Sequence, residues 1–338
     1  MSDVQIRAFR GDDLPAVAAL YARTLGPKHP RYCWPLNVDR LKRQYFGHPE
    51  YREDGLFVAE RMGMIAGFAF GAVRMHPITS SDDITPAYLS LLLVDEACRR
   101  RGIGTQLLER VAEFGRRCGK TVLNAHANPL NPVAFWPGVN RGWSEIVGFL
   151  QHHGFEVSEV AISVDQRLDH FEYSERVVKR RAELEKNDFR VIPYEPRFHD
   201  TLLETAAGFI ANWDLDMRSK IVRIENPFIE TAFLDLDRDN IYGPDDVTLA
   251  VCGDELAGYV AMARNPGETI SFLGPIHVIK KYEGMGLGSV MIQTALMAER
   301  ARGIELVDLW CTRKNAERFY FPNGFVQCDT WDQYGKPL

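Results

Sequence analysis

A basic, glycine-rich stretch at residues 99–105 is the part of this sequence best suited to chemistry. It consists of Arg99, Arg100, Arg101, Gly102, Ile103, Gly104 and Thr105. Glycine lets an anion approach the main chain with no Cβ in the way. If a helix begins here, its first N–H groups lack partners within the helix, and its dipole adds about half a positive charge. These features predict a cradle for a pyrophosphate group.

The segments on either side of this loop are those that such a cradle needs. Residues 89–94 are almost continuously apolar, which predicts a strand that is covered on both faces. After the loop, apolar residues recur every three or four positions, which predicts an amphipathic helix. These residues are Ile103, Leu107, Val111, Phe114 and Cys118. We therefore expect a strand, a tight loop and a helix in direct succession.

The spacing within the loop does not fit two common nucleotide-binding patterns. Leu107 stands where the dinucleotide fingerprint requires a third glycine, and the chain has no G-x-x-x-x-G-K-[ST] motif. The pattern R-x-x-G-x-G from Arg99 to Gly104 instead resembles the acyl-CoA loop of the GNAT superfamily of N-acetyltransferases. That loop is written [QR]-x-x-G-x-[GA], with a valine eight residues before its first glycine, and Val94 stands at this position. The resemblance implies acetyl-CoA as a co-substrate.

The pattern occurs a second time, in residues 270–303. A predicted strand and helix there flank a second loop, 283–289, and Val278 lies eight residues before its motif glycine. The residues of this loop proposed to contact the donor are Gly284, Met285, Gly286, Leu287, Gly288 and Ser289. Upstream, residues 56–68 match residues 247–259, and both read as a β-hairpin. The landmarks recur in the same order about 170–190 residues apart, which indicates a duplicated domain rather than a solenoid of short repeats.

We therefore expect an α/β fold with two tandem GNAT-like domains, each a mixed sheet with flanking helices. The first domain is predicted at residues 1–170 and the second at residues 188–338. The stretch from Tyr173 to Asp188 is highly charged and lacks glycine and proline. It predicts a linker helix with a solvated face at residues 171–187. The resemblance also implies that a backbone N–H near Leu93–Val94 or Val278 stabilises the oxyanion of the reaction.

The second half carries the most family-specific catalytic candidate. Residues 316–325 resemble the GNAT signature A-x-x-F-Y-x-x-x-G-F, and Tyr320 occupies the tyrosine position. By this resemblance, Tyr320 is the predicted general acid that protonates the leaving thiolate of CoA. An aromatic residue that only packs against the pantetheine arm is the alternative. In the first half Leu150 occupies the same position and has no proton to donate.

The second glycine loop departs from the family pattern in the opposite sense. Glu283 stands where the family has glutamine or arginine, and Met285 stands where a basic residue is frequent. Lys280 and Lys281 precede the turn and offer some compensating charge. The two halves thus divide the signature between them, and catalysis by only one of the two domains is left open.

The reaction implied by the resemblance is direct attack of an amine on the thioester. A lysine-like amine has a pKa of about 10.4, so reaching its neutral form at pH 7 costs roughly 4–5 kcal/mol. A general base must therefore accept a proton. The candidates near the central strands are Glu96, His126, Glu268 and His277, and the sequence does not decide among them.

Composition and charge limit the other classes of function. The 338 residues include 40 basic and 46 acidic side chains, a formal charge of −6, which argues against a dedicated nucleic-acid-binding protein. The sequence has no apolar run long enough to span a membrane, and we expect no signal peptide at its start. The six cysteines form no C-x-x-C pair, so we expect a reducing, cytoplasmic location and no metal.

The sequence thus predicts an acyl-CoA-dependent N-acyltransferase, with acetyl transfer to a primary amine as the expected reaction. One alternative is a non-catalytic acyl-CoA-binding or sensing protein, because a fold alone does not establish activity. Another is a different phosphate-binding enzyme, which the missing nucleotide motifs disfavour. The acceptor, a small-molecule or peptide amine, is not specified by the variable segments 24–55, 128–143 and 212–244. Homo-oligomerisation is also left open.

Overall fold

The structure is a computed structural model in which the chain forms two compact units. Unit 1 comprises Met1–Ala161 together with Thr330–Leu338, and unit 2 comprises Ile162–Asp329. The parts of the chain that the structure describes are residues 4–25, 38, 42, 52–75, 84–125, 138–207, 217, 220–222, 224–226, 243–264 and 267–338. Each unit is described by itself.

Unit 1 is built on a mixed sheet whose strands follow the order β1-β2-β3-β4-β5-β13. Neighbouring strands run antiparallel except β4 and β5, which are parallel. The bounds are β1 Val4–Ala8, β2 Leu56–Arg61, β3 Met64–Val73, β4 Pro86–Val94, β5 Val122–Ala125, β6 Val139–Asn140 and β13 Val326–Pro337. The hairpin and the central strand predicted from residues 56–68 and 89–94 are confirmed as β2, β3 and β4.

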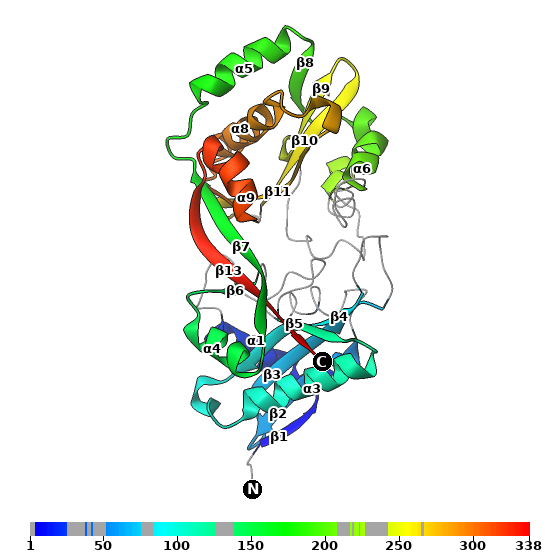
Figure 1. The fold of residues 1–338 in the computed structure, drawn as a ribbon, viewed down its shortest axis with the longest axis vertical. Helices are drawn as coiled ribbons and strands as arrows, with labels where there is room; N and C mark the ends of the chain where they lie inside the picture. The colour runs from blue at the N-terminus through cyan, green and yellow to red at the C-terminus, as the bar shows by residue number, and fades with distance from the viewer. Residues whose placement is uncertain are drawn as a thin grey trace. The chain divides into compact units, whose positions relative to one another are not determined.

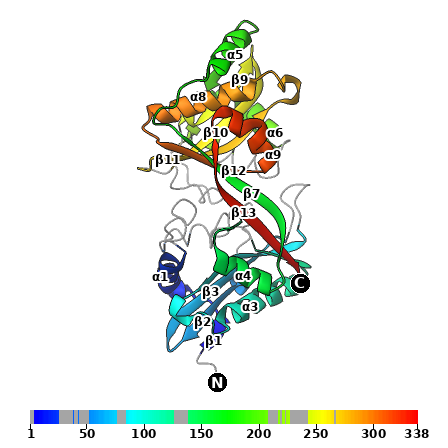
Figure 2. The ribbon, with the colours of Figure 1, turned by 60° about the vertical axis from the view of Figure 1, so that its left-hand side comes forward.

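Helices cover the sheet of unit 1 on both sides, and Figure 2 shows α1 and α3 flanking β3. The bounds are α1 Leu14–Thr24, α3 Ile103–Arg117 and α4 Ser144–His152, with short 3₁₀ turns at Gly11–Asp13, Glu53–Gly55 and Glu96–Cys98. The apolar stripe predicted on α3 is confirmed, because Ile103, Leu107, Val111 and Phe114 are all buried in the core. This packing fixes the start of α3 against the end of β4.

Unit 2 repeats this arrangement around the strands β8 to β12. Its sheet follows the order β7-β12-β11-β10-β9-β8, and β11 and β12 are its parallel pair. The strand bounds are β7 Glu156–Arg167, β8 Phe189–Pro193, β9 Val247–Cys252, β10 Glu255–Arg264, β11 Ile270–Val278 and β12 Leu306–Cys311. The helix bounds are α5 Glu175–Glu185, α6 His199–Ala207, α8 Leu287–Ala301 and α9 Arg313–Asn315, followed by a π-turn at Ala316–Tyr320 and a 3₁₀ turn at Phe321–Asn323. Further 3₁₀ turns lie at Pro196–Phe198, Pro244–Asp246 and Lys280–Tyr282.

The two faces of the unit 2 sheet carry separate cores. On one face, α8 packs with Ala250, Val260 and the strand β12. On the other face, α6 packs with Leu249, Val251 and Tyr259. The strand residues alternate between the two cores, as side chains on a pleated strand must. Figure 1 shows α8 and α6 on different sides of β10.

The last strand of the chain lies in the unit formed by the first half. Residues Tyr334–Pro337 of β13 pair with β5, and Trp331–Asp332 pair with β6. Conversely, residues Ile162–Arg167 of β7 pair with β12 in unit 2. The boundaries expected at residues 170 and 188 stay a prediction, and the sequence pattern contained no sign of this arrangement of final strands.

The expected fold class, a mixed α/β sheet with flanking helices in two related halves, is confirmed. The linker segment forms α5, whose buried Val177 and Leu184 pack in the core of unit 2. None of the helices described here is long and apolar enough to cross a membrane.

Candidate functional site

In each unit, two parallel strands begin side by side and then part. The strands β4 and β5 pair from Pro86 and Val122 up to Tyr88 and Asn124, although β4 continues to Val94. The strands β11 and β12 pair only up to Phe272 and Asp308, although β11 continues to Val278. A register shift interrupts β3–β4 and also β10–β11. Such irregularities bend a strand away from its neighbour. Beyond the last pair, β4 and β11 remain paired with β3 and β10 but leave the ladders with β5 and β12.

A glycine turn follows each of these parted strands. Gly102 has φ 77° and Gly286 has φ 78°, and each directly precedes a helix of 15 residues, α3 or α8. A residue with a Cβ is strained in this left-handed region. Because the first N–H groups of a helix have no partners within it, the turns leave main-chain donors at the starts of α3 and α8.

A further glycine in each turn allows an aromatic ring to approach closely. A Cβ built on Gly104 would lie 3.2 Å from the ring of Phe149, and one on Gly288 would lie 3.1 Å from the ring of Phe319. Val94 and Val278 lie at 3.7 and 3.6 Å from the same two positions. The predicted duplication therefore extends to individual contacts around the turns.

The predicted donor-binding residues differ in what they expose. Leu93, Ile103 and Leu287 are almost fully buried, so only their main-chain groups are suited to meet a ligand. Gly102 and Gly284 are exposed. The remaining predicted residues that are half-buried are Val94, Arg99, Gly104, Thr105, Val278, Met285, Gly286, Gly288 and Ser289.

The three arginines of the first turn have different surroundings. Arg100 and Arg101 are exposed, and Arg100 has the unusual φ of 59°. The guanidinium of Arg99 donates to the carbonyl oxygen of Val94 at 3.3 Å and to the Glu145 carboxylate at 2.9 Å. Arg99 therefore ties the loop to β4 and α4, and Arg100 and Arg101 supply the exposed charge.

The helix α4 closes one side of the first turn. The Thr105 hydroxyl lies 3.1 Å from Nε2 of His153, and the His153 ring packs against Phe149 with centroids 4.5 Å apart. Burial, with help from the charges of His152 and Lys336, lowers the pKa of His153. His153 is therefore held neutral at pH 7, and it does not add charge to this turn.

The second turn has little positive charge of its own. Glu283 is exposed beside it. Lys281 forms an ion pair with Glu255, which also accepts a hydrogen bond from the Tyr282 hydroxyl at 2.9 Å. The bond to Glu255 raises the pKa of Lys281. The sequence predicts that Lys281 compensates for the charge of Glu283, but its ammonium group is paired with Glu255 instead.

Arg180, which lies outside the second loop, places a positively charged side chain over the second turn. The side chain of Arg180 on α5 passes over Gly286, with Cγ, Nε and Cδ at 3.0–3.3 Å from the position of a Cβ there. Its guanidinium is about half exposed and contacts Glu183 at 2.8 Å. By contrast, only Gln106 comes within 4 Å of the corresponding position at Gly102, at 3.8 Å. Sequence reasoning missed Arg180, because it lies more than 100 residues from the loop.

Three polar contacts hold α5 in this place. Ser174 caps the helix by accepting a hydrogen bond from the Val177 N–H, and Gln293 of α8 accepts from the Ser174 N–H at 3.0 Å. Arg181 donates to the Thr294 hydroxyl on α8. Because Val177 is buried as well, α5 is fixed against α8, and Arg180 has a defined anchor.

Tyr320 lies at the end of the π-turn on the same face as α8. Its side chain is 8% exposed and packs edge-on against Phe319 and Phe325. Burial raises the pKa of Tyr320, and nearby Cys311 adds to the effect. Burial also raises the pKa of the Cys311 thiol, to about 11. Both groups therefore keep their protons at pH 7, and π-turns of this kind are frequent at functional sites.

The candidate general bases lie in separate places. Glu96 and Glu268 are exposed, at the turn after β4 and before β11. His277 is half-buried on β11 beside Tyr259, with ring centroids 6.0 Å apart, and burial lowers its pKa. His126 lies outside the described residues, as do most of the acceptor segments 24–55, 128–143 and 212–244.

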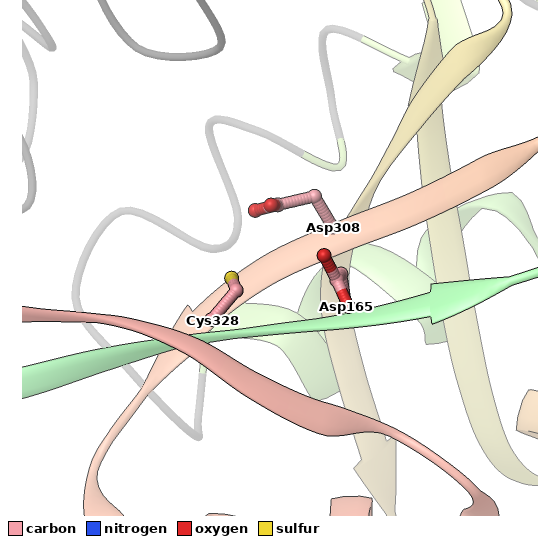
Figure 3. A group of neighbouring side chains, drawn as sticks. All are labelled: Asp165, Asp308 and Cys328. Carbon is pink, nitrogen blue, oxygen red and sulfur yellow. The ribbon is translucent and has the colours of Figure 1, made fainter. Parts of the chain in front are cut away.

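One group of side chains in unit 2 has the composition of a metal-binding set. Single oxygen or sulfur atoms of Asp165, Asp308 and Cys328 all lie within 4.8 Å of one another. Figure 3 shows the three side chains on β7, β12 and β13, gathered on one side of these strands. The absence of a metal stays a prediction from the sequence.

Comparison with known proteins identifies the origin of this geometry. A family model described as the acetyltransferase (GNAT) family matches residues 15–136 and again residues 209–325, which together exceed half of the chain. The chain belongs to the GNAT family. Members of this family use acetyl-CoA as the acyl donor and act on amines of small molecules or peptides. Each of the two matched regions contains one of the two glycine turns of this GNAT protein.

One curated relative matches part of the sequence, and solved structures share the fold at low sequence identity. An uncharacterized N-acetyltransferase of Methanocaldococcus jannaschii is 33% identical over 109 residues, which is 32% of this chain and 42% of the relative. A glucosamine N-acetyltransferase region of a fungal multi-domain GH3 β-N-acetylglucosaminidase has TM-score 0.75 and 16% identity, covering 98% of this chain and 38% of that longer protein. A tandem GNAT protein from the clavulanic acid biosynthesis pathway has TM-score 0.66 and 16% identity, covering 99% and 98%.

Proposed function

We propose that this GNAT protein transfers an acetyl group from acetyl-CoA to a primary amine, and that unit 2 performs the chemistry. The observation that carries the proposal is the combination, within unit 2, of parted strands, a glycine turn and the protonated Tyr320. A main-chain N–H near Val278 is suited to stabilise the oxyanion. Unit 1 repeats the strands and the turn but has Leu150 at the tyrosine position.

In this proposal, the donor is held by main-chain groups of the turns and by the gap between the parted strands. The diphosphate binds at the N–H groups of residues 284–289 in unit 2 or 99–105 in unit 1, where helix dipoles favour an anion. The pantetheine arm enters between the parted strands, which places the thioester beside Tyr320. Because burial raises its pKa, Tyr320 is in the form that can protonate the departing thiolate.

The first unit favours a second role, that of a donor-binding module without turnover. It presents Arg100 and Arg101 at an open turn, but Leu150 has no proton for the leaving group. We therefore propose that both turns bind acetyl-CoA and that only the donor in unit 2 reacts. The proposed acceptor is a small-molecule or peptide amine and the proposed location is the cytoplasm.

Two measurements test this function. Calorimetry with acetyl-CoA should detect binding in the micromolar range, and undetectable heat at millimolar donor would contradict both roles. Release of free CoA thiol should then be followed with a panel of amines, which includes glucosamine because a structurally similar protein region acts on it. Polyamines, amino acids and peptides complete the panel. Binding without thiol release from any amine would favour the sensing role over catalysis.

A further inference from the structure

We propose that Asp308 is the general base for the acceptor amine in unit 2, an inference that rests on the proposed function. Asp308 occupies the last position at which β12 pairs with β11, opposite Phe272. Beyond it the two strands part, and this is where the thioester of the proposed donor would lie. A base that acts on the attacking amine must lie within hydrogen-bond reach of this place.

Asp308 lies on the face of the sheet opposite the proposed acid. Val307, Leu309 and Cys311 belong to the core that also contains Tyr320 and α8. Since side chains alternate along a strand, Asp308 faces the other way, toward the side of the sheet that α6 covers. An amine that attacks the thioester from this side has Asp308 beside it, and the thiol leaves on the side of Tyr320.

The two acid–base groups occur together in one unit and are missing together from the other. The last paired residue of β5 in unit 1, equivalent to Asp308, is Asn124, which does not act as a base near pH 7. The residue equivalent to Tyr320 is Leu150. This joint replacement is what loss of one reaction from a duplicated site should leave behind.

Asp308 lies beside other titratable side chains at this position. Asp308 is fully buried, and its cross-strand partner on β7 is Asp165. Like charges directly opposite one another destabilise a sheet. Among the described residues, Asp165 and Cys328 bring titratable atoms within 4.8 Å of Asp308, and Figure 3 shows all three on one side.

The proposed step balances as follows. The Asp308 carboxylate takes a proton from the ammonium form of the acceptor and releases it to water. The neutral nitrogen then bonds to the acyl carbon, its next proton passes to Asp308, and the carbon–sulfur bond breaks. The sulfur takes the proton of the Tyr320 hydroxyl, so an amide and a thiol leave. Asp308 then gives its proton to water and Tyr320 recovers one, which returns both residues to their starting states.

The test compares Asp308→Asn, nearly equal in shape, with wild type on an amine that the panel identifies. We expect kcat to fall by about 10²–10⁴ at pH 7, the usual contribution of a general base, with acetyl-CoA affinity unchanged within about twofold. As the pH rises, more of the free amine is already neutral, so the variant should recover about tenfold per pH unit. A residue with only a structural role would not produce this recovery.

Matched variants separate the outcomes. Asp308→Glu, which keeps a carboxylate, should lose less activity than Asp308→Asn, and Asn124→Ala in unit 1 should keep the wild-type kcat. Unchanged kcat in Asp308→Asn, or a loss that high pH does not relieve, overturns the proposal. Activity that a chelator abolishes and a divalent metal restores overturns it in favour of a metal held by Asp165, Asp308 and Cys328. If wild type turns over no amine at all, the proposed function fails as well.

Discussion

The two glycine turns have the same steric frame and different chemical groups. Gly104 with Phe149 and Gly288 with Phe319 are matched to within 0.1 Å in their closest approach, 3.2 and 3.1 Å. The charged and proton-bearing groups around them differ. Unit 1 has exposed arginines within its loop, whereas unit 2 has Glu283 in its loop and receives Arg180 from α5.

This difference shows which positions a duplicated fold can change. A glycine against an aromatic ring or at φ near 77° resists substitution, because any Cβ meets an atom or a strained backbone. Positions 150 and 320 lie in the cores of their units, where one holds leucine and the other tyrosine. We infer that the fold was kept in both units while the acid–base chemistry was kept in one.

Among the changes that compare the two turns, the largest expected effect comes from removing the proposed acid. Tyr320→Phe should lower kcat by about 100-fold, because the thiolate must then leave without a proton donor. Acetyl-CoA affinity should stay within about twofold, since the ring still packs against Phe319 and Phe325. Steady-state kinetics measure kcat, and calorimetry measures the affinity for acetyl-CoA. Tyr334→Phe, which removes a tyrosine hydroxyl from unit 1, is the control and should keep kcat.

A change of loop charge should show that the turns use different cations. Arg101→Glu should weaken acetyl-CoA binding at the first turn by about tenfold, or about 1.4 kcal/mol, because an exposed charge beside the diphosphate is reversed. Lys281→Glu should have a smaller effect, since the ammonium of Lys281 is already paired with Glu255. Calorimetry on both variants makes the comparison, and the reverse order would show that the second turn is the main donor site.

The role of α5 gives a smaller effect with an informative sign. Arg180→Ala should weaken donor binding at the second turn by about threefold, because an exposed charge contributes about 1 kcal/mol or less. Titration should be followed in a variant that already carries Arg101→Glu, so that the second turn dominates. Tighter binding in Arg180→Ala would show instead that the arginine covers the turn and keeps the donor out.

A pH effect on unit 1 is the smallest that we expect. The pKa of His153 is lowered in the folded state, so its stabilising contribution is complete above the unfolded pKa of about 6.5 and is lost as pH falls through the folded pKa. His153→Gln should therefore make the loss of stability between pH 7.5 and 5.5 shallower. Urea unfolding at both pH values measures this, and an unchanged slope would contradict the account of His153.

Local patterns were enough to predict the turns and the strands that lead into them. The apolar run at residues 89–94 and the helical spacing after Gly102 are confirmed, because both depend on neighbours within a few positions. Residues 313–323, which contain the tyrosine signature, form α9 followed by a π-turn and a 3₁₀ turn. Hydrophobic spacing does not distinguish these helix types over so short a segment.

Long-range pairing set the limit of what the sequence could predict. Arg180 reaches Gly286 only because α5 packs on α8, and Asp308 meets Asp165 only through the β7–β12 register. The pairing of Tyr334–Pro337 with β5 in unit 1 joins residues about 200 positions apart. None of these contacts has a local signal, so a base could not be assigned from the sequence.

A crystal structure with acetyl-CoA tests the central claim most directly, because it shows where the thioester lies. The account predicts a diphosphate at the N–H groups of residues 284–289, with the thioester sulfur within hydrogen-bond distance of the Tyr320 hydroxyl. A donor bound only in unit 1, or one that avoids the gap between β11 and β12, would contradict catalysis by unit 2.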